Sequence, residues 1–203
     1  MKKATFSGTK SILCKILLCL LALLLAAGTA FAEDTSSENT AGIEISFTYQ
    51  RGTTIASNQL AVWVEDAEGA VVKTPLVTDF TAGRRGYRNR TMSLPVWVAA
   101  ADPESMTDEE IDTVSGATPG QGELVYIWDF TNQVGERVPD GVYTVHVEGT
   151  FYWESDALYT AVIDTANLAD EITIEMERTA PETHDNENMI TGVTIKAVQE
   201  INR

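Results

Sequence analysis

Residues 43–49 read Ile43-Glu44-Ile45-Ser46-Phe47-Thr48-Tyr49, with apolar side chains at the odd positions and polar side chains at the even positions. This period of two is typical of a β-strand that buries one face. Further strand-like segments follow, separated by turn residues; they are 60–64, 70–77, 123–129, 142–153, 158–163, 172–176 and 190–198. Such a series of short strands predicts an all-β fold, an immunoglobulin-like antiparallel β-sandwich.

One or two short helices are expected as an insert at about residues 93–112. Ser93-Leu94-Pro95 has the features of a helix start, with a serine cap and an early proline. Thr107-Asp108-Glu109-Glu110 predicts a second start, because Thr107 and Glu110 can form a capping box, and Ile111 would be the buried residue of that turn. Residues 81–91 have no periodicity, so a loop is expected there.

The first 32 residues have the organisation of a secretory signal peptide. They contain four of the 14 basic residues and none of the 30 acidic residues. An apolar run at 16–27 and small residues up to Ala32 follow. That run is too short to span a bilayer, so we expect cleavage after Ala32 and no integral membrane segment in the mature protein. The expected organisation is a signal peptide at 1–32, a flexible leader at 33–41 and a single domain at 42–203.

The composition of the mature part excludes several classes of site and partner. Both cysteines, Cys14 and Cys19, lie in the signal peptide, so disulfides, iron–sulfur clusters and thiol nucleophiles are excluded. The net charge of the whole chain is −16, and the net charge of the mature part is more negative still, because the signal peptide carries four basic and no acidic residues. Such acidity argues against nucleic acid and anionic membrane surfaces as partners.

Few residues suggest catalysis or metal binding. His146 is expected on the solvent face of its strand with Thr144 and Glu148, and His184 lies in a polar segment, so a histidine metal site is not expected. The acidic stretch 102–112 is interpreted as a solvated face rather than a cation site. Four arginines either bind an anionic ligand or neutralise that stretch; they are Arg84, Arg85, Arg88 and Arg90. The four tryptophans are expected in the sandwich core; they are Trp63, Trp97, Trp128 and Trp153.

The run Asp112-Thr113-Val114-Ser115-Gly116-Ala117-Thr118 stands apart from the rest of the chain. It lies in an expected loop, where the small side chains of Gly116 and Ala117 would leave the Thr118 hydroxyl uncovered. The run resembles the Asp-x-x-Ser-Gly-Ala-Thr motif of extracytoplasmic FMN-binding domains, in which a transferase esterifies the phosphate of FMN to the threonine. The resemblance implies covalent FMN on Thr118, within a cofactor-binding motif formed by Asp112, Ser115, Gly116, Ala117 and Thr118. Pro119 follows, where that family usually has serine or threonine.

A wider resemblance covers about residues 43–165. It is carried by Leu60–Gly69, Trp97, Asp112–Thr118, Trp128-Asp129 and Val138–Tyr143, which are similar to the exported domain-of-unknown-function family 2271 of periplasmic proteins. That family is often linked with flavinylated redox systems of the cell envelope. The segment 128–143 also resembles the immunoglobulin-like module of flagellar hook-capping proteins, a likeness that concerns fold rather than function.

These resemblances imply an exported flavin-carrier domain that passes electrons in an extracytoplasmic redox chain, rather than a catalyst. The expected partners are an extracytoplasmic FMN transferase and a membrane flavoreductase or another redox protein. Trp97 or Trp128 could stack on the flavin ring, and the arginines could pair with its phosphate. One alternative is a non-catalytic immunoglobulin-like binding or structural module of the envelope. Another is a cation-dependent hydrolase that uses the acidic stretch.

Overall fold

The computed structural model describes residues 42–51, 58–83, 86–151, 155–169, 171–179 and 189–199. The chain divides into two units, Met1–Glu38 and Asn39–Arg203, and all described residues belong to the second. The expected signal peptide and leader therefore lie outside the described residues, as do Arg84, Arg85, Trp153 and His184. No helix in the described ranges is long and apolar enough to cross a membrane.

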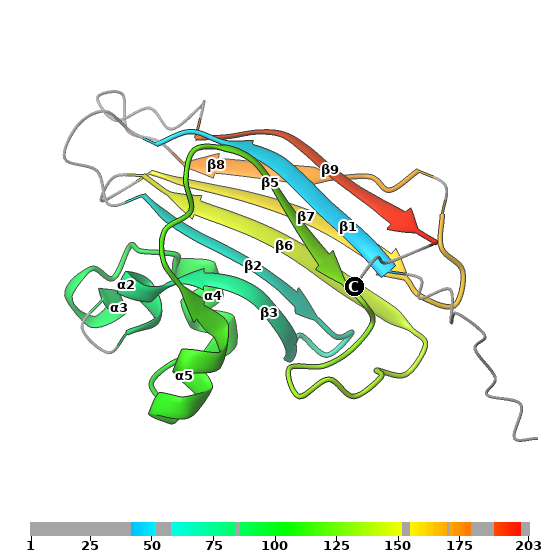
Figure 1. Cartoon of the computed structure of the whole chain (residues 1–203), viewed down its shortest axis with the longest axis horizontal. Coiled ribbons are helices and arrows are strands. Elements are labelled where there is room, and N and C mark those ends of the chain that lie inside the picture. Colours follow the sequence, from blue (N-terminus) through cyan, green and yellow to red (C-terminus); the bar gives the residue numbers. More distant parts are fainter. Residues whose placement is uncertain are drawn as a thin grey trace, which may run out of the picture. The chain divides into compact units, whose positions relative to one another are not determined.

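The described part of the domain contains two β-sheets (Figure 1). The smaller sheet has the order β5-β1-β9, and the larger has the order β4-β3-β2-β6-β7-β8. All neighbouring strands are antiparallel except the short parallel pair β3–β4. The strands are β1 (Gly42–Tyr49), β2 (Gln59–Glu65), β3 (Val71–Thr78), β4 (Ser115–Gly116), β5 (Gly122–Trp128), β6 (Val142–Thr150), β7 (Asp156–Asp164), β8 (Glu175–Thr179) and β9 (Ile190–Val198). The predicted all-β sandwich is confirmed.

The main core lies between the two sheets and is formed by alternate residues of each strand. From β1 it takes Ile43, Ile45, Phe47 and Tyr49, the apolar positions of the alternating stretch. Leu60, Val62 and Val64 of β2 and Tyr143, Val145 and Val147 of β6 face them from the larger sheet. At the sandwich end, the Tyr143 hydroxyl donates a 2.6 Å hydrogen bond to the Pro139 carbonyl oxygen. This bond ties β6 to its preceding turn, as a tyrosine corner does.

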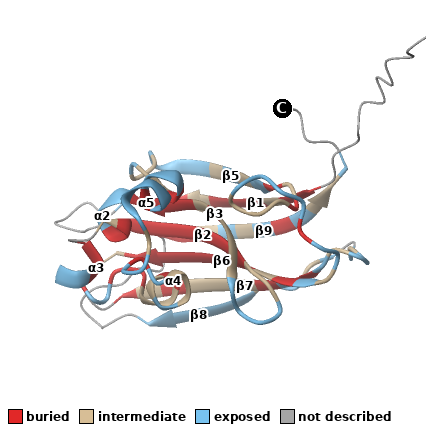
Figure 2. Cartoon of the chain, turned by 90° about the horizontal axis from the view of Figure 1, so that it is seen from below, coloured by how far each residue is buried: buried red, intermediate tan, exposed pale blue. Residues whose placement is uncertain are grey.

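A second core covers the opposite face of β2 and β3. Ala61 and Trp63 of β2 and Val77 of β3 pack there against Ala82, Leu94, Trp97, Ile111 and Val114. These partners come from the helical insert, which consists of α2 (Asp79–Ala82), α3 (Gly86–Asn89), α4 (Pro95–Ala101) and α5 (Asp108–Val114), and from Leu94, which precedes α4. Both faces of β2 are therefore buried, whereas β8 at the sheet edge is exposed (Figure 2). The larger sheet is the middle layer of three.

The helical insert is longer than the sequence pattern predicted. It begins at Asp79 rather than near 93, and the expected loop at 81–91 contains the end of the single-turn helix α2 and the whole of the single-turn helix α3. Ser93 does not cap α4; its hydroxyl instead lies 2.6 Å from that of Thr81, and Leu94 occupies the cap position with φ 50°. The capping box of α5 is confirmed, because the Glu110 N–H reaches Thr107 Oγ1 and the Thr107 N–H reaches the Glu110 carboxylate.

The strand expected at 172–176 is shifted. β8 begins only at Glu175, while Ile172 and Ile174 pack on the sandwich core from an irregular segment. Apolar spacing alone does not distinguish such a segment from a strand, since both bury every second side chain.

Candidate functional site

The motif 112–118 lies where the chain passes from the helical insert to the smaller sheet. Asp112 lies on the exposed side of α5, and the helix ends at Val114. Ser115 and Gly116 then form β4, which pairs with Val77 and Thr78 of β3 at the edge of the larger sheet. The next residues lead to β5, the edge strand of the other sheet (Figure 1). The motif therefore lies on the rim of the sandwich.

The side chains of the motif differ in their exposure. Ala117 is exposed, whereas Ser115, Gly116 and Thr118 are half-buried. A Cβ atom at Gly116 would lie 3.2 Å from Leu76 Cδ1, so the absence of a side chain there lets β4 pack closely on the core. In the described part of the chain no hydrogen bond or ion pair joins Asp112 to the Thr118 hydroxyl. Thr118 is therefore partly accessible to solvent as a residue.

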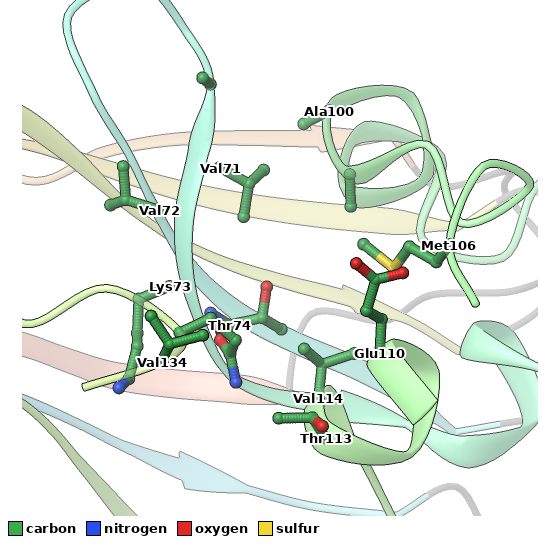
Figure 3. A pocket seen from close by; sticks show the side chains of 13 residues that line it. Val71, Val72, Lys73, Thr74, Ala100, Met106, Glu110, Thr113, Val114 and Val134 are labelled. Carbon is green, nitrogen blue, oxygen red and sulfur yellow. Dashed lines mark hydrogen bonds between the residues drawn. The ribbon is translucent and has the colours of Figure 1, made fainter. Parts of the chain in front are cut away.

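A pocket of about 410 Å³ adjoins the motif (Figure 3). One wall is the first half of β3, a second wall is the end of α4 and the helix α5, and the third is the loop between β5 and β6. Val114, the last residue of α5, lines the pocket directly before Ser115. The lining is mainly apolar, and it includes Val71, Val72, Ala100, Met106, Val114 and Val134. No pattern in the sequence predicted this pocket.

The β5–β6 loop is fastened to β3 by polar contacts. Lys73 Nζ donates to the Asn132 carbonyl oxygen at 2.8 Å and to Thr131 Oγ1 at 3.2 Å. The Thr74 N–H donates to Gln133 Oε1 at 2.9 Å. These bonds hold the third wall of the pocket in place and leave Val134, 79% exposed, at its mouth.

His146 is buried, and the expectation that it lies on a solvent face is wrong. Its ring stacks on Trp63, with centroids 4.6 Å apart, and its Nε2 lies 3.5 Å from a Glu65 carboxylate oxygen. The other oxygen of Glu65 accepts a 2.7 Å hydrogen bond from the Trp63 indole N–H. Burial lowers the pKa of His146 below its ordinary value, although Glu65 raises it. The ring is therefore neutral at pH 7 and has the role of a packed side chain.

Glu148, also expected in solvent, is completely buried and caps α4. Its two carboxylate oxygens accept hydrogen bonds from the N–H groups of Val96, at 2.9 Å, and Trp97, at 2.8 Å. Burial and then the nearby Asp156 raise the pKa of Glu148 to about 8, while the two N–H donors lower it. Burial also raises the pKa of Asp156 to about 6. Because the pKa of Glu148 is raised to about 8, this carboxyl group holds a proton at neutral pH.

The structure describes two of the four arginines of this segment, Arg88 and Arg90. Arg88 makes a 2.7 Å ion pair with Glu104 of the acidic stretch, as the counterion interpretation expects. Arg90 is buried, and burial lowers its pKa. In the described ranges no group of three or more histidine, cysteine, aspartate or glutamate residues could hold a metal ion.

The tryptophans pack in two different cores. Trp128 belongs to the sandwich core, whereas Trp63 and Trp97 belong to the core beneath the helices. All three side chains are fully buried. The expectation that Trp97 or Trp128 could stack on a bound ring is therefore wrong.

The comparison with known proteins gives one family match. No curated protein and no solved structure matches the chain. Residues 41–180 match the model of a family described as predicted periplasmic protein (DUF2271), a range that covers β1 to β8, the helical insert and the 112–118 motif but not β9. That description places the protein outside the cytoplasm. The chain belongs to the DUF2271 family.

Proposed function

We propose that this protein is an exported flavin carrier that holds FMN covalently on Thr118 and passes electrons in an extracytoplasmic redox chain. In the adduct, Thr118 Oγ1 is the ester oxygen on the phosphate of FMN, with the net loss of one water between threonine and FMN. The isoalloxazine ring supplies the one- and two-electron chemistry, and the protein supplies attachment and surroundings.

The observation that carries the proposal is the position of Thr118 within a matching motif. Its half-buried side chain follows an exposed alanine on the rim of the sandwich, and the motif matches at Asp112, Ser115, Gly116, Ala117 and Thr118. A modifying enzyme must enclose the hydroxyl, so a rim position with small neighbours suits the reaction. The exposed carboxylate of Asp112 suits a role as a ligand for the metal of that enzyme.

The surroundings of Thr118 fit a flavin. The phosphate would lie at the surface, where water solvates its charge, and the adjoining apolar pocket offers a place for an aromatic ring. Covalent attachment also suits a compartment outside the cytoplasm, because a free cofactor would diffuse away.

Expression of the full chain with an export-competent FMN transferase tests the proposal. We expect the purified protein to be yellow and to gain the mass of FMN minus water, and we expect Thr118→Ala to lose both. Thr91→Ala is the matched control, since Thr91 is an exposed threonine that lies outside both the motif and the pocket lining. It should keep the adduct. Unmodified wild-type protein, in cells whose transferase modifies another substrate, would contradict the proposal and favour a non-catalytic envelope module.

A further inference from the structure

We infer that the pocket between β3, the ends of α4 and α5, and the β5–β6 loop binds the isoalloxazine ring of the flavin carried on Thr118. This inference rests on the proposed function and adds to it a specific ring site. It concerns a site whose walls come from three separate segments of the chain.

The pocket lies within reach of a flavin attached to Thr118. Val114 lines the pocket and Thr118 is four residues further along, so their Cα atoms are at most about 14 Å apart. On β3 the pocket ends at Thr74, and Val77, the partner of Ser115, lies about 10 Å beyond it. The ribityl phosphate arm of FMN is a flexible chain of single bonds that spans a separation of this order. A ring tethered at Thr118 therefore has this pocket within its range.

The side chains that line the pocket suit the chemistry of the flavin ring. Apolar side chains from all three walls surround the pocket, which suits the dimethylbenzene part of the ring. Polar side chains also line it, and they are Lys73, Thr74, Glu110, Thr113 and Gln133. These side chains suit the oxygen and nitrogen atoms of the pyrimidine part. The pocket thus offers both apolar surface and polar groups to the ring.

Lys73 brings a positive charge to the wall of the pocket. Its ammonium group has three N–H donors, and the β5–β6 loop uses two of them. Its charge also acts on the nearby Asp129 carboxylate, so a ligand would share the field of Lys73 with that group. A positive charge beside a flavin stabilises the more negative reduced form, so Lys73 would raise the reduction potential of the bound ring.

The test uses the flavinylated full chain and measures how iodide quenches the fluorescence of the flavin. We expect the ring in the wild-type protein to be quenched several-fold less than free FMN, because the pocket shields it. Val134→Arg places a charge at the mouth of the pocket and should increase quenching several-fold. Val162→Arg is the matched control, since Val162 is another exposed valine, 63% exposed on β7 and not part of the pocket lining. It should leave quenching unchanged.

A second measurement uses the reduction potential. Lys73→Met should make the potential of the attached flavin more negative, and Lys73→Arg should keep it near the wild-type value. An adduct that is quenched like free FMN, or equally in the two valine variants, would overturn the ring site and leave the carrier function intact. Unchanged potentials in Lys73→Met would overturn the role of Lys73. A protein without any adduct would overturn both the carrier function and the ring site.

Discussion

Replacement of Glu148 by alanine is expected to lower the free energy of unfolding by about 3 kcal/mol. The Glu148 carboxylate accepts the N–H groups of Val96 and Trp97 at the start of α4. Alanine would leave both donors buried without an acceptor, and a helix start that loses its cap is destabilised further. Urea denaturation at pH 7, followed by tryptophan fluorescence, measures the change.

Two further variants make this prediction specific. Glu177→Ala removes an exposed glutamate from β8 of the same sheet and should change the stability little. Glu148→Gln keeps one oxygen acceptor but turns an amide NH₂ toward the second N–H, so its loss of stability should lie between those of the other two variants. Equal stabilities of Glu148→Ala and Glu177→Ala would show that the buried carboxylate does not anchor α4.

Stability is also expected to fall as the pH rises from about 6.5 to about 8. Burial raises the pKa of Glu148 to about 8, above the ordinary value of a glutamate, so the native state keeps a proton that the unfolded chain has already lost. The native state binds more protons in this window, and its free energy of unfolding therefore decreases with pH, by up to about 1.4 kcal/mol per pH unit for one proton. Denaturation curves at several pH values measure the slope.

The buried groups Asp156 and His146 determine the pH range in which the slope reports Glu148 alone. Burial raises the pKa of Asp156 to about 6. Its contribution to stability is therefore lost in a lower range of pH, as the pH rises from about 4 to about 6. Burial lowers the pKa of His146, which decreases stability as the pH falls below about 6.5 and so opposes the carboxyl pair there. Well above pH 6.5 the His146 ring is neutral in both states. Glu148→Gln should flatten the slope in that range, and an unchanged slope in this variant would contradict the assignment to Glu148.

The strands of the sandwich could be predicted because most of them bury one face against the other sheet. The alternating stretch of β1 and the segment 190–198 of β9 both became strands at nearly the expected residues. The same rule gave the wrong environment for His146 and Glu148, which lie at polar positions of β6. The helical insert covers the face of β6 that bears His146 and Glu148. The sequence of β6 itself does not indicate that a third layer covers this face.

The candidate site was predictable only where it is contiguous in sequence. The 112–118 motif could be recognised because its residues follow one another and end a capped helix. The pocket could not, since its walls meet only in the folded chain: α5 packs on β3 through the second core, and the β5–β6 loop is joined to β3 by Lys73 and Gln133. The cap of α4 was missed for the same reason, because its acceptor lies about fifty residues away from the helix start.

The position of β2 has a consequence for solvent exchange of the backbone. β2 pairs with β3 on one side and β6 on the other, and every side chain from Gln59 to Val64 is buried. Its amide hydrogens can meet deuterium only when the whole domain opens, whereas those of the exposed edge strand β8 exchange through local fraying. Deuterium uptake at β2 therefore reports the global stability of this protein directly, without chemical denaturant.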